Sequence, residues 1–169
     1  MTDKALFEAV PNFSCGKELA VVEQIADSLR SFKGAALLDY SADADHNRAV
    51  YTLAGEAEPL TAALLAACRT ARDLIDLRDH QGTHPRIGAC DVLPLIPLQN
   101  ATMQQAAHLA QAVGQNIFDE FSDHQPEIIE EFRRIIPQPR AQIVHVCKRD
   151  AKNIRQCGAD WGNHRPYHP

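Results

Sequence analysis

Two kinds of apolar pattern alternate along the first 121 residues of this chain, and their order restricts the folds available to it. Apolar residues three or four positions apart, the spacing of an amphipathic helix, occur in three segments: 17–32, 61–77 and 102–121. Short apolar or alternating runs, which are typical of strands, occur in four segments: 6–13, 35–40, 48–54 and 89–96. The predicted order is therefore β-α-β-β-α-β-α.

This order predicts the sheet as well as the elements. Two split βαβ halves give an α/β (α+β) sandwich of the ferredoxin-like, β-α-β-β-α-β type over about residues 5–120. We expect a mixed sheet with helices on one face and a buried strand at 35–40. Pro94 and Pro97 cannot donate to a ladder, so the last strand should be broken or lie at an edge.

Length, charge and hydropathy limit the class of protein. The 169 residues suffice for one domain with a real core, which we place at 1–121. The net charge is -5 and there is no Lys/Arg block, which argues against a nucleic-acid partner. No apolar run approaches the roughly 20 residues of a membrane span, and the N-terminus lacks the apolar core of a signal peptide. We expect a cytoplasmic protein.

The number and spacing of the cysteines indicate structural residues rather than reactive or metal-binding ones. There are five, at irregular spacing and without a C-x-x-C pair, which argues against a zinc ribbon or a redox dithiol. Cys68 lies in an Ala- and Leu-rich helical run and should be a core residue. Cys15 and Cys90 flank the polar loops described next. We expect both to be packing thiols, because a nucleophilic cysteine needs an open, electropositive setting.

Three polar junctions follow apolar runs, and such loops on a rigid scaffold commonly carry function. The first is V-P-N-F-S-C-G at 10–16. The second is L-L-D at 37–39, followed by N-R-A-V-Y-T at 47–52. The third is the loop H-Q-G-T-H-P-R-I-G-A-C-D at 80–91, which combines two histidines, an arginine and two glycines.

Together, and in this order, the three junctions resemble the N-terminal subdomain of glutamate formimidoyltransferase. The resemblance covers roughly residues 5–120. It implies a folate-dependent transferase that moves a formimino group from N-formimino-L-glutamate to tetrahydrofolate, its co-substrate, in histidine degradation and one-carbon metabolism. No metal is implied.

The resemblance assigns the chemistry to two residues. His84, in the His-Pro-Arg motif, takes the position of the acid/base histidine. A histidine with a pKa near neutrality can remove a proton from the attacking amine and deliver one to the departing nitrogen. Asp39, predicted at the C-terminal end of a buried strand, matches the aspartate that orients this histidine. The alternatives are a loop histidine bonded to the backbone and an aspartate that caps a turn.

Five further residues are candidates for binding substrate or folate. Arg48 and Arg86 suit carboxylates, with ion pairs to Asp43, Asp45 or Asp91 as the structural alternative. Three smaller candidates complete the set: Asn12, Asn47 and Gly88. The asparagines could position amide or pterin edges or simply form turns, and Gly88 permits close backbone approach.

A metal site is the weaker reading of the same loops. His46, His80 and His84, with Asp43 and Asp45, offer enough ligands, but their spacing matches no metal-binding helix motif. A metal-dependent hydrolase is therefore a distant alternative to the transferase. A nearer alternative is a non-catalytic, stand-alone subdomain that binds folate or a partner chain.

The tail at 122–169 departs from the family pattern. It could hold a helix at 126–136 and a strand at 141–147, and a one-base shift of the codons behind 141–148 would read more like the family. In the family, substrates bind between this subdomain and a second one. We therefore expect weak or absent activity from this chain alone, and an exposed apolar patch beside the His84 loop, where a second subdomain or a second copy would pack.

Overall fold

The protein is represented by a computed structural model that describes residues 4–78, 80–83 and 88–121. Within them, nine elements occur in the order β1, β2, α1, β3, β4, α2, β5, β6 and α3. The predicted helix and strand of the tail lie outside the described residues, as do His84 and Arg86. Among the described residues, no helix is long and apolar enough to cross a membrane.

Two of the predicted strands are each divided in two by a proline. The first run gives β1 (Leu6–Ala9) and β2 (Asn12–Phe13), with Pro11 between them. The last run gives β5 (Cys90–Val92) and β6 (Leu95–Gln99), with Pro94 between them. Because proline has no N–H to donate, the ladder stops at these points and resumes beyond them, as predicted for the last strand.

The central hairpin consists of β3 (Ala35–Asp43) and β4 (Arg48–Gly55). The prediction of a short, buried strand at 35–40 is wrong: β3 is three residues longer and mostly exposed. Among the described strands it pairs with β4 alone, so one of its edges has no neighbour. A bulge between Leu37 and Asp39 accompanies the high exposure, 61%, of Leu38.

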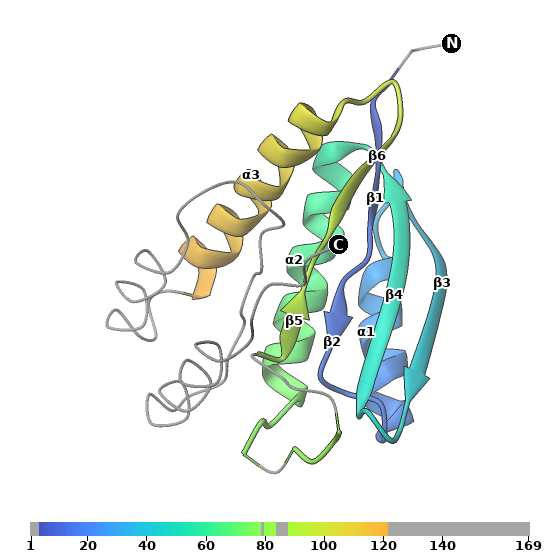
Figure 1. Ribbon diagram of the computed structural model, residues 1–169, viewed down its shortest axis with the longest axis vertical. Helices are drawn as coiled ribbons and strands as arrows, with labels where there is room; N and C mark the ends of the chain where they lie inside the picture. The colour runs from blue at the N-terminus through green and yellow to red at the C-terminus, as the bar shows by residue number, and fades with distance from the viewer. Residues whose placement is uncertain (1–3, 79, 84–87, 122–169) are drawn as a thin grey trace, which may run out of the picture.

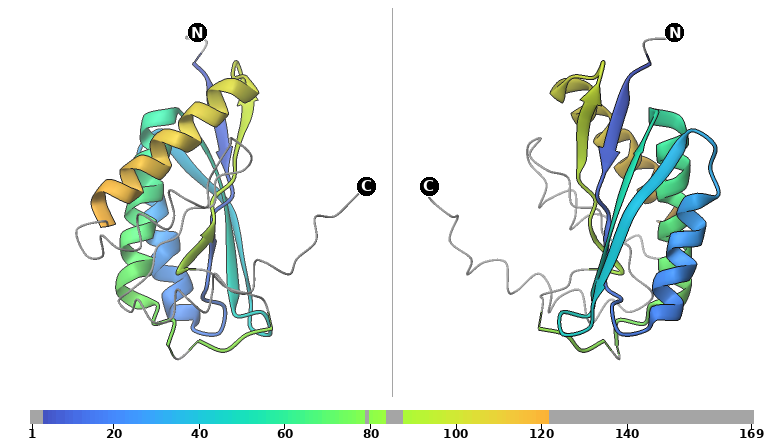
Figure 2. Two further views of the ribbon diagram at one scale, coloured as in Figure 1. Left: turned by 60° about the vertical axis from the view of Figure 1, so that its left-hand side comes forward. Right: turned by 90° about the vertical axis from the view of Figure 1, so that its right-hand side faces the viewer.

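All described pairings are antiparallel, and the strands follow the order β5-β2-β4-β1-β6 with β3 on the outer side of β4. The expectation of a mixed sheet is therefore wrong for this part of the chain. The α/β class is confirmed, and Figure 2 shows the three helices on one side of the sheet.

Local chemistry marks the end of one helix and the start of another. Helix α1 (Leu19–Arg30) is followed by Gly34, whose φ of 98° suits glycine. Helix α3 (Met103–Phe121) begins with a reciprocal capping box, in which Thr102 and Gln105 bond to each other's backbone N–H.

Helix α2 (Ala57–Leu74) begins four residues before its predicted start. The Thr61 hydroxyl donates to the carbonyl of Ala57 inside the helix and does not cap its start. Pro59 lies in the first turn of the helix. Proline is tolerated in a first helical turn, where its missing N–H has no partner to lose.

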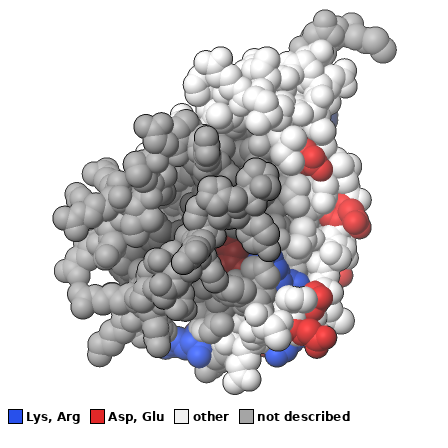
Figure 3. Space-filling view, in the orientation of Figure 1, with Lys and Arg blue, Asp and Glu red and all other residues white. Residues whose placement is uncertain are grey.

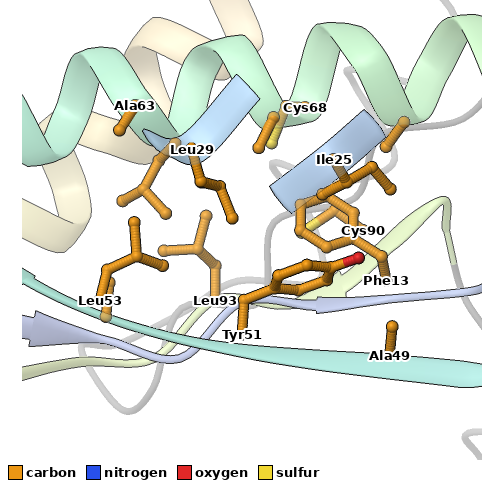
Figure 4. Packing of buried hydrophobic residues seen from close by; sticks show 14 of the residues in the cluster. Phe13, Ile25, Leu29, Ala49, Tyr51, Leu53, Ala63, Cys68, Cys90 and Leu93 are labelled. Carbon is orange, nitrogen blue, oxygen red and sulfur yellow. The ribbon is translucent and has the colours of Figure 1, made fainter. Parts of the chain in front are cut away.

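The core lies between the helices and one face of the sheet. In β4, Ala49, Tyr51 and Leu53 are fully buried and alternate with half-buried residues that point the other way. Ile25 and Leu29 of α1 and Ala63 and Cys68 of α2 approach from the other side (Figure 4). Cys68 is therefore the core residue that the sequence predicted.

Candidate functional site

The described parts of the His84 loop are held at one end of the sheet, next to the turn between β3 and β4 (Figure 1). The N–H of Thr83 donates to the carbonyl of Asp45 at 3.1 Å. Nε2 of His80 lies 3.0 Å from the carbonyl oxygen of Asn47. Because that oxygen can only accept, the proton sits on Nε2. Thus the residues on the N-terminal side of His84 are fixed to the hairpin turn.

Gly82 allows this close approach. A Cβ at that position would lie 2.3 Å from the carbonyl oxygen of His46, which is backbone and cannot rotate away. Gly16, in the connection between β2 and α1, is as restricted, since a Cβ there would lie 2.2 Å from the carbonyl oxygen of Asp43. Glycines therefore let three chain segments meet at this end of the molecule.

Asn47 joins those three segments. It lies in the β3–β4 turn with a φ of 50°, a conformation that asparagine tolerates better than most residues. Its side-chain oxygen accepts from the N–H groups of Gly16, at 2.8 Å, and Lys17, at 3.1 Å. Its side-chain NH₂ donates to the carbonyl of Gln81 at 3.1 Å. The predicted substrate-binding Asn47 is thus engaged with backbone.

On the C-terminal side of the loop, Asp91 fixes Gly88. The N–H of Gly88 donates to one Asp91 oxygen at 3.1 Å, and the Ser14 hydroxyl lies 3.3 Å from the other and 2.8 Å from the Gly88 carbonyl. Asp91 is 4% exposed. A buried carboxylate is stable here because several donors face it. The sequence interpretation named Asp91 only as an ion-pair partner and missed this role, although Asp91 ends the third motif.

Arg48 points to the face of the sheet that carries no helix. Its Nε donates to the side-chain oxygen of Asn12 at 3.0 Å, and its guanidinium lies 3.8 Å from Asp91. Asn12 in turn donates from its NH₂ to the carbonyl of Val10. The structural alternative for Arg48, an ion pair with Asp91, is therefore present, and Asn12 serves as its partner. Binding of substrate by either residue stays a prediction.

Asp39 is not at the end of a buried strand, contrary to expectation. It lies in the middle of β3, is exposed, and pairs with Thr52 of β4. Four residues separate it from Asp43, which corresponds to roughly 13 Å along a strand. Because Thr83 is bonded to the far side of that hairpin turn, the described geometry does not bring Asp39 to the loop.

Between α1, the end of α2 and the loop is a cleft of about 330 Å³. Among its lining residues are Ser14, Lys17, Asn47, Asp76 and His80. Lys17 reaches across it, and its ammonium group donates to the carbonyl of Gln81 at 2.9 Å. The sequence interpretation missed Lys17, which has no pattern beyond its place after the first motif.

The neighbouring thiols are packed and unreactive in character. Cys15 is 5% exposed, and burial raises the pKa of its thiol to about 12. Cys90 is fully buried, and its contact with Cys68, together with burial, raises its pKa well above the usual value. A thiol held neutral at physiological pH is a poor nucleophile, which supports the reading of both as packing residues.

The residues that suggested a metal point to other partners. The His46 ring lies 2.9 Å from Asp43, while His80 bonds to the Asn47 carbonyl. In the parts of the chain that the structure describes, no group of three or more His, Cys, Asp or Glu side chains could hold a metal ion. His84 lies outside those parts, so the metal question stays a prediction.

Comparison with known proteins gives a consistent result. Residues 6–150 match the family described as formiminotransferase domain, N-terminal subdomain. A formimidoyltransferase-cyclodeaminase of Rattus norvegicus is 42% identical over 117 residues, which cover 69% of this chain and 22% of the rat protein. A glutamate formimidoyltransferase of Streptococcus pyogenes serotype M1 is 38% identical over 112 residues, covering 66% of this chain and 38% of that protein.

A glutamate formimidoyltransferase of Thermoplasma acidophilum is 37% identical over 116 residues, again 69% of this chain and 38% of the relative. The matched part of the chain thus spans well under half the length of these relatives. The family match covers most of the chain and includes all three motifs. The chain belongs to the formiminotransferase family, in the part that corresponds to its N-terminal subdomain.

Proposed function

We propose that this chain is the N-terminal part of a folate-dependent transferase that moves a formimino group from N-formimino-L-glutamate to tetrahydrofolate. The observation that carries the proposal is the family match over residues 6–150, with relatives named glutamate formimidoyltransferase. Parts of all three motifs meet at one end of the sheet, where Asn47 and Asp91 fix the two sides of the loop that contains His84, whereas Asp39 lies farther along β3.

The proposed reaction needs one proton to change places. The N5 amine of tetrahydrofolate attacks the formimino carbon, and the bond from that carbon to the glutamate nitrogen breaks. His84 would accept the N5 proton and return it to the departing nitrogen. One imidazole can perform both transfers because its pKa lies near the working pH.

Asp39 remains the proposed partner of His84, with a stated structural condition. Its carboxylate is exposed on the helix-free side of the sheet, on β3. For it to orient the His84 ring, the substrates and the loop must come together over that face. Asn12, Arg48, Arg86 and Gly88 are proposed to bind the carboxylates and amides of the two substrates.

We further propose that the fold is ferredoxin-like. If β1 with β2, and β5 with β6, each count as one interrupted strand, the connections read β-α-β-β-α-β. The antiparallel pairings and the helices on one face support this assignment.

The helix-free face of the sheet is the proposed interface for a second subdomain. It carries apolar side chains at its β6 side, where Ile96 is 40% exposed, as well as the polar Arg48 and Asn12. In the face seen in Figure 3, acidic side chains lie along the right-hand border, and acidic and basic side chains occur together at the lower end, near the β3–β4 turn. A mixed apolar and charged face of this kind suits a subdomain interface with substrates between its halves.

The test is tetrahydrofolate-dependent loss of formiminoglutamate in the presence of the purified chain, together with tetrahydrofolate binding measured by calorimetry. We expect binding with weak or no turnover from the chain alone, and higher turnover when a chain supplying the second subdomain is added. His84→Ala should remove that turnover without changing thermal stability. His108→Ala, on the exposed side of α3, is the matched control.

Four outcomes decide between the candidate functions. Undiminished turnover in His84→Ala would exclude the proposed mechanism. Folate binding with no turnover, even after addition of the second subdomain, would favour the stand-alone binding module. Turnover that chelators abolish would favour the metal-dependent alternative. Absence of both binding and turnover would overturn the proposal for this chain.

A further inference from the structure

The side chain of Asn47 links segments that are far apart in the sequence. Its oxygen accepts from Gly16 and Lys17, and its NH₂ donates to Gln81, 34 residues later in the chain. All three partners are backbone groups of other segments. An amide with both ends engaged in this way can set the relative position of the segments that it joins.

Other contacts hold the same loop against the same turn. The Thr83 N–H donates to the Asp45 carbonyl, and His80 Nε2 donates to the carbonyl of Asn47 itself. Gly82 fits under the His46 carbonyl only because it has no Cβ. Within the described residues, 80–83 therefore rest on the β3–β4 turn. The Asn47 side chain also connects them to the segment before α1, as does Lys17, whose ammonium group donates to the same Gln81 carbonyl.

We propose that Asn47 is a positioning residue, which fixes residues 80–83 and thereby the start of the segment that contains His84. The inference rests on the proposed function for the catalytic role of His84, but its structural content does not. Asn47 acts through the loop rather than by touching substrate. This departs from its assignment as a substrate-binding residue.

Two substitutions distinguish the hydrogen bonds of the Asn47 side-chain oxygen from the one that its NH₂ group donates. Asn47→Asp keeps an oxygen that can accept from Gly16 and Lys17 but removes the donor to Gln81. Asn47→Ala removes both. Asp tolerates a positive φ nearly as well as Asn, so backbone strain changes little. Asn100 is the matched control, because its φ is 51°, close to the 50° of Asn47, and its side chain lies at an exposed turn.

The measurement is amide hydrogen exchange by NMR on the full chain. In Asn47→Asp, the Thr83 amide should exchange about three- to tenfold faster, as expected for the loss of one hydrogen bond, while the Gly16 and Lys17 amides stay protected. In Asn47→Ala, all three amides should exchange faster. Asn100→Asp and Asn100→Ala should leave all three unchanged.

A pH profile distinguishes positioning from general destabilisation. When the new carboxyl group of Asn47→Asp is protonated, below about pH 4, it can donate to Gln81 as the amide did. The ratio of the Thr83 exchange rate in this variant to that in the unsubstituted chain at the same pH should then return toward one. In the transfer assay with the second subdomain present, the same variant should lower kcat and leave KM nearly unchanged.

The exchange and transfer measurements have outcomes that would overturn the positioning role of Asn47 or the proposed function separately. Unchanged Thr83 exchange in Asn47→Asp would overturn the proposal, as would the absence of recovery at low pH. Global unfolding of both Asn47 variants would also overturn it, since Asn47 would then be required for the whole fold. If exchange behaves as expected but the unchanged chain never shows folate-dependent transfer, the proposed function fails and the positioning role stands.

Discussion

The two faces of the sheet differ in what they contribute. Tyr51 and Thr52 are neighbours in β4, yet Tyr51 is fully buried under the helices and Thr52 is half-buried on the helix-free side. The Tyr51 ring contacts those of Phe13 and Tyr40, and its hydroxyl donates to the Val22 carbonyl. Among the described residues, the covered face holds the fold together, whereas the other face carries Arg48, Asn12 and Asp39.

The largest expected difference between the faces is in the free energy of unfolding. Tyr51→Ala should lower it by about 3–5 kcal/mol, because a large ring leaves a cavity that the core cannot fill. Thr52→Ala should lower it by less than about 1 kcal/mol. Chemical denaturation of both variants measures the contrast. Similar losses for the two would show that the helix-free face is also part of the core.

A second comparison sets a buried carboxylate against an exposed one. Asp91→Ala should lower the free energy of unfolding by about 2–4 kcal/mol, because it leaves the Gly88 N–H unmatched in a buried site and removes the carboxylate that faces Arg48. Asp39→Ala should change it by about 0.5 kcal/mol or less, since this side chain is exposed. Thermal unfolding of the two variants gives the values. A large loss from Asp39→Ala would contradict its exposed position on β3.

A third comparison uses two glycines, whose replacement by alanine should change the free energy of unfolding in opposite directions. Gly82→Ala should destabilise the chain by about 1–3 kcal/mol, because the new methyl group meets the backbone of the hairpin turn and forces it to move. Gly114→Ala, inside α3, should stabilise it by about 1 kcal/mol through helix propensity. Urea unfolding midpoints test both signs. A stabilising Gly82→Ala would mean that the loop does not rest on the turn.

The last comparison concerns a dependence of stability on pH, which is small near neutral pH. Burial raises the pKa of the Cys15 thiol from 9.0 to about 12, so the folded chain holds this proton more tightly than the unfolded chain. The associated stability is present below pH 9 and is lost as the pH rises toward 12, by at most about 1.4 kcal/mol per pH unit. Denaturation between pH 8 and 10 measures the slope, which Cys15→Ala should reduce. An equal slope in that variant would assign the dependence to other groups, such as Tyr51, whose pKa burial also raises.

Local signals predicted the elements whose formation depends on local chemistry. The alternation in β4, the turn at Gly34 and the interruption at Pro94 are all present where expected. Local signals failed where a neighbouring segment determines whether a strand is buried or exposed. The apolar run at 35–40 suited a buried strand, but β3 lies at the outer side of β4, so most of its residues are exposed.

The candidate site likewise combines features that the sequence predicted with features that it did not. The motifs identified which segments matter, and they include most of the residues that fix the described ends of the loop, Lys17 and Asp45 being exceptions. They did not reveal what each side chain does. Asp91 was read as an ion-pair partner and Asn47 as a substrate contact. Yet Asp91 bonds to the nearby Gly88 backbone and to the Ser14 side chain, and Asn47 bonds to backbone of distant segments.

The sequence by itself determined the family, the order of helices and strands, and the three motifs that would carry chemistry. These depend on residue type and spacing, which local sterics and hydropathy convert into structure. Tertiary structure alone decided that Asp39 lies away from the described loop, that Asn47 joins three segments and that the three described helices all cover the same face of the sheet. The physical reason is that a hydrogen-bond partner, an exposed face or a close contact is set by segments that meet only after the chain has folded.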